Sequence, residues 1–257
     1  MAERVQGGSL AGSHEGKPGL PRGRSRLPAR AVRASQHERL CRAVIAAVAE
    51  AGYADVTVAD IVRRAKVSRV AFYAHFRGKE DCFLAATREG GQLMADRVVA
   101  ATRDLPPDTA DEEVLRAGIR AFLGFLADEP AFARVFYIDM PTAGPRAVGR
   151  FEAAERRFAE MTATWHRRAR RRNSQWPAVP DDAYMAIEGA TAQLVRASVR
   201  NGETHALPKL EDTIISLHLA VIAARPWPGG QDLLNAVSAR RGEPSRPSLA
   251  RPCARHP

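Results

Sequence analysis

The chain has 257 residues, of which 45% are hydrophobic, and this length and composition are typical of a folded globular protein with one large domain or two small ones. No apolar run approaches the roughly 18 residues that a membrane-spanning helix needs, and the first residues lack the continuous apolar segment of a secretory signal. These observations argue against a membrane protein and predict a cytoplasmic one, with no membrane among its partners.

The three cysteines are Cys41, Cys82 and Cys253, which are too far apart in the sequence to form a Cys-x-x-Cys pair. Neither a disulfide framework nor a zinc motif is therefore predicted. We interpret them as ordinary reduced thiols and expect neither a metal nor a cofactor.

The net charge of +10 is concentrated at the two ends of the chain. Residues 1–34 contain seven basic and two acidic residues, and residues 240–257 contain five and one, which leaves a net charge of +1 between them. A high pI that comes from the tails says little about a folded domain. Binding to nucleic acid must therefore be argued from the residues between the tails, which are called the body below. The Gly, Pro, Ser and Arg content predicts disorder for residues 1–34 and for most of residues 225–257.

Between these tails, apolar residues recur at intervals of three and four, and no segment alternates as a strand does, so we predict an all-α protein. The first helix is expected at residues 35–51, with Leu40, Val44 and Val48 on one face and Gly52 after its end. Further helices are expected at residues 79–104, 111–127, 130–139, 146–172, 181–200 and 208–223.

Two short helices lie between residues 57 and 76. Thr57 and Ser68 are placed to cap them, and Lys66 and Val67 form the turn between them. This arrangement is a helix-turn-helix, whose second helix enters a major groove of DNA. Phe72 and Phe76, four residues apart, are expected to point inward.

The opposite face of the second short helix carries polar and cationic side chains. Arg69 could bind a guanine edge, and Val70 or Ala71 could touch a thymine methyl group, whereas Tyr73 is placed to contact a phosphate. Phosphate contacts fix the register of a protein on DNA and base contacts give its specificity. The predicted DNA-binding residues are Thr57, Ser68, Arg69, Val70, Tyr73, His75 and Lys79.

The run "TVADIVRRAKVSRVAFYAHFRGKEDCF", residues 57–83, resembles the DNA-binding signature of the tetracycline-repressor (TetR) family of transcriptional regulators. The resemblance implies an all-helical homodimer with a three-helix DNA-binding domain at residues 35–83 and a helical effector-binding and dimerisation domain at residues 84–224. It also implies that Tyr73, His75 and Lys79 contact the DNA backbone. Two positions depart from the family pattern: Lys66 replaces the usual turn glycine, which suggests a different turn or an added phosphate contact, and Ala71 replaces Thr or Ser.

Aromatic residues in the middle of the chain have helical spacing, which usually indicates core. In a fold like that of the family, the same helices surround a site for a small, hydrophobic effector. The residues predicted to line this pocket are Phe122, Phe125, Phe136, Phe158, Trp165 and Gln193. Glu188, Thr191 and His166 are further polar candidates, and a surface position is an equal alternative for each.

The last two helices offer small and aliphatic residues suited to close packing with a second copy. The predicted dimer interface consists of Ala190, Ala197, Leu210, Ile214, Leu217 and Val221. An internal hairpin that covers the monomer core is the alternative.

Together these features predict a ligand-responsive repressor that binds a near-palindromic double-stranded operator as a homodimer, in a bacterial cytoplasm and associated with the nucleoid when bound. A non-specific DNA-packing protein is the first alternative, although the near-neutral body argues against it. An enzyme that uses the aromatic cavity is the second, but no catalytic or phosphate-binding motif supports it. The arginines at residues 22–33 also allow a basic arm that lies along the DNA.

Overall fold

The computed structural model describes residues 8–12 and 28–224, and every regular element within them is helical, which confirms the predicted fold class. None of these helices is both long and apolar enough to cross a lipid bilayer. The α-helices are α1 (Ala29–Ala51), α2 (Val58–Ala65), α3 (Arg69–His75), α4 (Lys79–Arg103), α5 (Asp111–Asp128), α6 (Pro130–Arg134), α7 (Pro145–Arg172), α8 (Asp181–Arg200) and α9 (Glu211–Ile222).

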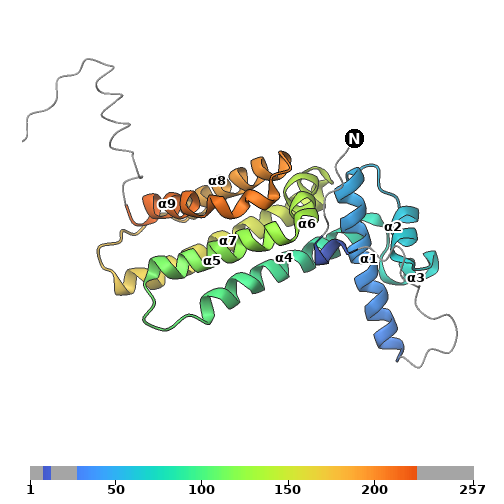
Figure 1. Ribbon diagram of the computed structural model, residues 1–257, viewed down its shortest axis with the longest axis horizontal. Helices are drawn as coiled ribbons and strands as arrows, with labels where there is room; N and C mark the ends of the chain where they lie inside the picture. Colours follow the sequence, from blue (N-terminus) through green and yellow to red (C-terminus); the bar gives the residue numbers. More distant parts are fainter. Residues whose placement is uncertain (1–7, 13–27, 225–257) are drawn as a thin grey trace, which may run out of the picture.

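The long helices α4, α5, α7, α8 and α9 run side by side as a bundle, and α1, α2 and α3 form a head at one end of it (Figure 1). The helix α4 continues from the head into the bundle, so it belongs to both parts (Figure 1). Leu40, Val44 and Val48 are fully buried on the face of α1 that their spacing predicts.

The N-terminal region differs from the predicted tail of residues 1–34. Helix α1 begins at Ala29 rather than at residue 35, because Ala and Arg in residues 29–34 favour a helix. A short 3-10 helix, η1 (Ser9–Ala11), also lies within the predicted tail. The remaining residues of that tail, and residues 225–257, lie outside the described part of the chain.

The η1 helix is fixed to a buried carboxylate at the start of α6. The backbone N–H groups of Ser9 and Leu10 donate to Glu129 Oε1 and Oε2, each at 2.9 Å, and the Ser9 hydroxyl also donates to Oε1 at 2.5 Å. A Cβ at Gly8 would lie 2.3 Å from the Asp128 carbonyl oxygen, so only glycine fits there. The first described residues are therefore a specifically bound part of the fold.

Helix α6 packs against α1 of the head, and its Phe132 ring also packs against α4. A Cβ added at Gly90 of α4 would lie 2.2 Å from the Phe132 ring, so the ring packs directly on the helix backbone. Phe132 is fully buried and packs edge-to-face with Phe125 and at a tilt with Phe136, at ring-centroid distances of 5.9 and 5.5 Å. This aromatic row leaves no room for a larger residue at Gly90.

Two predicted helices are divided in the structure. The segment expected at residues 130–139 is α6 followed by one π-helical turn, Val135–Asp139. The last helix is preceded by a 3-10 segment, Thr204–Leu210, because Pro208 cannot donate a helical backbone hydrogen bond. Arg116 and Arg120 of α5 bind Glu211 at 3.0 and 2.8 Å and hold the start of α9.

Candidate nucleic-acid interface and cavity

A complete capping box begins the first helix of the helix-turn-helix. The Asp60 backbone N–H donates to Thr57 Oγ1 at 3.3 Å, and the Thr57 N–H donates to Asp60 Oδ2 at 3.0 Å. The hydrogen bonds from the Thr57 side chain and backbone hold the pKa of the Asp60 carboxyl below its usual value. The structure therefore gives Thr57, which is exposed, a capping role.

The turn between α2 and α3 has the geometry that glycine normally supplies. Lys66 adopts φ 54° and ψ 41°, in the left-handed region, at the C-cap of α2. Ser68 then caps α3 by accepting a hydrogen bond from the Ala71 N–H at 3.1 Å. The lysine therefore does not produce a different turn, which corrects the first of the two expectations for this position.

Helix α3 buries one face and exposes the other, as predicted. Phe72 and Phe76 are buried against the head. The opposite face exposes Ser68 and Arg69, and Val70 and Tyr73 are 82% and 49% exposed. A large aliphatic and a large aromatic side chain, left in water on a seven-residue helix, are suited to contact with another molecule.

His75 and Lys79 are less free than the other predicted contacts. The Lys79 ammonium donates to the carbonyl oxygens of Tyr53 and Ala54, at 2.7 and 3.3 Å, and lies 4.3 Å from the centroid of the Tyr53 ring. Partial burial lowers its pKa. His75 Nε2 lies 3.4 Å from the side-chain oxygen of Gln36, and burial lowers its pKa as well. Both side chains hold the head together, and a phosphate could use only their remaining donors.

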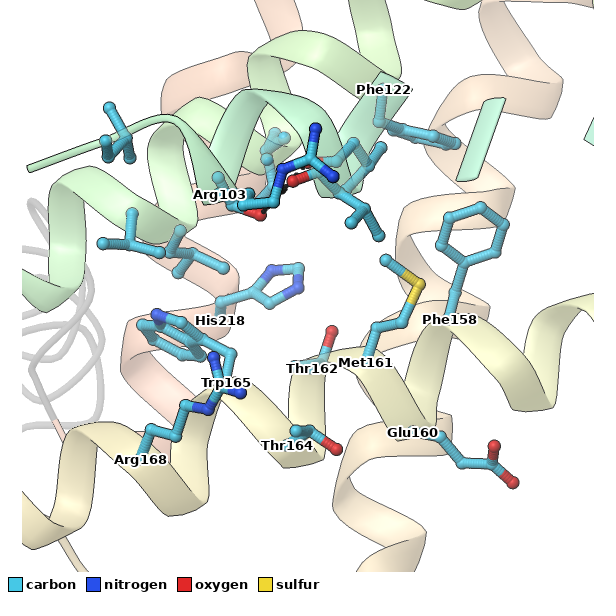
Figure 2. A pocket seen from close by; sticks show the side chains of 18 of the residues that line it. Arg103, Phe122, Phe158, Glu160, Met161, Thr162, Thr164, Trp165, Arg168 and His218 are labelled. Carbon is cyan, nitrogen blue, oxygen red and sulfur yellow. Dashed lines mark hydrogen bonds between the residues drawn. The ribbon is translucent and has the colours of Figure 1, made fainter. Parts of the chain in front are cut away.

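A cavity of about 880 Å³ lies within the bundle, between α4, α5, α7, α8 and α9. Figure 2 shows Phe122, Phe158 and Met161 along one side of it and Trp165 and His218 along the other. The aromatic residues Phe122 and Phe158 pack together at a centroid distance of 5.7 Å. The wall is mainly apolar, and its volume is that of a small-molecule site.

A few polar groups interrupt this apolar wall. Thr162 donates to Glu188 Oε1 at 3.3 Å, and burial raises the pKa of the Glu188 carboxyl to about 7. The Thr191 hydroxyl is buried without a hydrogen-bond partner. His218 Nδ1 lies 2.8 Å from the Ile214 carbonyl oxygen and must carry the hydrogen of that bond, while burial lowers the pKa of the ring to about 4. The neutral ring therefore keeps Nε2 as an acceptor.

The predicted pocket residues fall into two groups. Phe122, Phe158 and Trp165 line the cavity, as do Glu188 and Thr191. Phe125 and Phe136 lie instead in the aromatic row beside Phe132, Gln193 is exposed, and His166 is buried with its Nδ1 2.8 Å from the Tyr184 hydroxyl. Thr162 and His218 could not be predicted as wall residues, because their side chains face the cavity only once the helices are packed.

Comparison with known proteins identifies the head. Residues 42–86, which span the C-terminal part of α1, all of α2 and α3, and the start of α4, match the family model described as "Bacterial regulatory proteins, tetR family". The chain carries a tetR-family DNA-binding domain. The tetR-family match covers the capped helices, the turn and the exposed face described above.

Solved structures of regulators have the same fold over most of this chain. The fatty acid degradation regulator FadR from Bacillus halodurans superposes with a TM-score of 0.65 at 18% identity, over 72% of this chain and 94% of its own. FadR from Bacillus subtilis, in complex with stearoyl-CoA, gives 0.62 at 17% identity, over 72% and 98%. SmeT, the repressor of a Stenotrophomonas maltophilia multidrug efflux pump, gives 0.58 at 18% identity, over 72% and 89%. The bundle thus has the fold of TetR-family regulators.

The residues predicted for a dimer interface are not all at the surface of this TetR-like bundle. Ile214 is fully buried and lines the cavity, so it cannot reach a second copy, and its assignment to the interface was wrong. Val221 is exposed, and Ala190, Ala197, Leu210 and Leu217 are partly exposed. A Cβ added at Gly189 of α8 would meet no atom within 4 Å. The accessible members of the predicted set, which lie on α8, on α9 and at the end of the 3-10 segment before α9, are thus all apolar.

Proposed function

We propose that this protein is a ligand-responsive transcriptional repressor that binds a near-palindromic DNA operator as a homodimer. The exposed face of α3 carries the proposal, because it presents Ser68, Arg69, Val70 and Tyr73 on a helix whose other face is buried. The tetR-family match of this segment supports a DNA partner. In this proposal, residues 35–83 bind DNA and residues 84–224 bind the effector and the second subunit, in the cytoplasm and on the nucleoid.

The roles of the α3 residues follow from their positions. Arg69, in the first turn, would bind a guanine edge in the major groove, and its guanidinium carbon lies 5.8 Å from the centroid of the Tyr73 ring, so the two act on adjoining parts of the DNA. Val70 would contact a thymine methyl group. Tyr73, and the free donors of His75 and Lys79, would bind phosphates and set the register.

Dimerisation would use the outer face of α8 and α9, where the exposed and partly exposed members of the predicted set lie. Small residues there allow two helices from each subunit to approach closely and form a four-helix interface. The symmetry of such a dimer would place two α3 helices at half-sites about one turn of DNA apart, or a multiple of it.

The cavity would bind the effector, a small and largely hydrophobic molecule. Its apolar wall supports this class of ligand, and the similar B. subtilis FadR is described in complex with stearoyl-CoA. The cavity adjoins α4, which also supports the head, so a ligand that favours one position of α4 would shift the spacing of the two heads. By linkage, operator and effector would then weaken each other's binding by the same factor.

The test is selection of random-sequence duplexes by the purified full chain at fixed salt, with Arg69→Ala and Tyr73→Ala in parallel. Enrichment of one near-palindromic site is expected, with specificity relaxed in Arg69→Ala by about 1–3 kcal/mol at one base pair. Tyr73→Ala should weaken all sites evenly. Arg171→Ala, an exposed arginine near the end of α7 that lies away from the head, is the matched control and should bind as the unmodified chain does (Figure 1).

Equal binding to unrelated duplexes would contradict the proposal and favour a non-specific DNA-packing protein. Specificity that Arg69→Ala leaves unchanged would remove Arg69 from the groove.

A further inference from the structure

Three metal-ligand side chains converge beside the DNA-binding head. His37 and Cys41, four residues apart, lie on one face of α1, and Glu89 faces them from α4. His37 Nε2 lies 2.7 Å from Glu89 Oε1, and the ligand atoms of all three residues lie within 4.8 Å of one another. Within residues 8–12 and 28–224, these three residues form the one group of histidine, cysteine and carboxylate side chains close enough to share an ion.

The three ligands differ in burial in a way that allows an ion to enter. Cys41 is buried, whereas the side chains of His37 and Glu89 are 33% and 41% exposed. The thiol therefore forms the floor, and the imidazole and the carboxylate form a rim that solvent reaches. A cation could bind at the rim and then draw in the thiol.

We propose that His37, Cys41 and Glu89 form a binding site for a divalent cation of the zinc type. One nitrogen, one sulfur and one carboxylate oxygen suit zinc, whereas magnesium and calcium prefer oxygen ligands alone. Ligand bonds of about 2.0–2.3 Å in a tetrahedron separate neighbouring donor atoms by roughly 3.3–3.8 Å. The donor atoms lie between 2.7 and 4.8 Å apart, so their separations must change by about 1 Å or less to reach that geometry, and water would complete the tetrahedron.

Binding requires two proton movements. Cys41 is a buried thiol, and a zinc-type cation binds the thiolate, so the thiol proton must leave when the cation binds. The cation would displace that proton to solvent and bind the thiolate. His37 must offer an unprotonated Nε2, so a proton held there moves to Nδ1 or to solvent.

The position of the site gives it a structural consequence. The His37 ring lies 5.2 Å from the Phe76 ring and 5.8 Å from the His75 ring, measured between centroids, at the end of α3. An ion held by α1 and α4 would therefore cross-link the head to the helix that runs into the bundle. This cluster could not be predicted from local spacing, because Glu89 is 48 residues from Cys41.

The test is a titration of the full chain with Co²⁺, a spectroscopic substitute for zinc, with Zn²⁺ competition and Mg²⁺ as the negative control. Cys253→Ser is the background for all variants, so that this third thiol cannot contribute. One Co²⁺ per chain is expected, with a thiolate-to-cobalt charge-transfer band that Zn²⁺ removes and Mg²⁺ does not. Zn²⁺ should also raise the melting temperature.

Variants identify the ligands. Cys41→Ser should abolish the band, and Cys82→Ser, the neighbouring buried thiol outside the cluster, should retain it. His37→Gln and Glu89→Gln are at the rim, so folding should be unaffected, and each should weaken Zn²⁺ binding more than about 100-fold, because loss of an outer-sphere partner alone costs 10–100-fold. If Cys41→Ser does not fold by circular dichroism, the two rim variants decide. Absence of the band, or unchanged affinity in both rim variants, would overturn the proposal.

Discussion

Two adjacent glycines in α4 test how closely the Phe132 ring packs on this helix. A Cβ at Gly90 would lie 2.2 and 2.6 Å from two carbons of the buried Phe132 ring, whereas a Cβ at Gly91 would meet its nearest neighbour, in Phe136, at an ordinary 3.9 Å. Alanine favours a helix over glycine by about 1 kcal/mol at either position. Overpacking should cost Gly90→Ala about 1–3 kcal/mol in addition, because the row of rings around Phe132 prevents it from moving.

The free energy of unfolding of Gly90→Ala should therefore lie about 1–3 kcal/mol below that of Gly91→Ala. In a chain of this size this difference corresponds to roughly 2–12 °C in melting temperature. Urea titration and thermal melting, each followed by circular dichroism, measure it directly. Because the helix-propensity gain cancels between the two variants, equal stabilities would show that α4 and Phe132 do not pack as closely as described.

Lys66→Gly should raise the free energy of unfolding by about 0.5–1 kcal/mol. The left-handed backbone costs a residue with a side chain about 1–2 kcal/mol, and the greater entropy of glycine in the unfolded chain offsets part of that gain. Lys66→Ala keeps that strain, so its free energy of unfolding in urea should not rise. If Lys66 contacts a phosphate, both variants lose that contact, and the salt slope of DNA binding should fall equally in both. Glu188→Gln should flatten the pH dependence of stability. Burial raises the Glu188 carboxyl pKa from 4.5 to about 7, so the unmodified chain should lose about 1–3 kcal/mol of stability as pH rises through that range. Urea midpoints that change with pH in parallel for Glu188→Gln and the unmodified chain would refute this. Gly189→Arg should give monomers by light scattering, and Gly149→Arg, an equally open glycine on α7, should remain dimeric; a dimeric Gly189→Arg places the interface elsewhere.

The helix-turn-helix could be predicted from sequence because its signals are local. The Thr57 and Ser68 caps, the four-residue spacing of Phe72 and Phe76, and the short turn all lie within 20 residues, and the structure has them as expected. Lys66 is the exception. Its residue type suggested a different turn, but its backbone adopts the left-handed conformation that glycine normally supplies.

The cavity could be predicted only in part, because its walls depend on how the helices pack. Phe122 and Phe125 are three residues apart on α5, yet one faces the cavity and the other faces Phe132. Ile214 fits a coiled-coil spacing that suits an outer interface as well as an inner wall, and the bundle places it inside. Periodicity identifies an apolar face but not the neighbour that covers it.

The attachment of η1 to Glu129 means that the N-terminus cannot be trimmed without effect. A chain shortened to begin at residue 28 would remove the three donors on the Glu129 carboxylate and leave a buried acid at the start of α6 without those partners, at a cost of about 1–3 kcal/mol or more. Weaker DNA binding by such a chain would therefore mix loss of the basic arm with loss of this anchor. Replacing only the arginines at residues 22, 24 and 26 would separate the two effects, because that change leaves Ser9 and Leu10 in place.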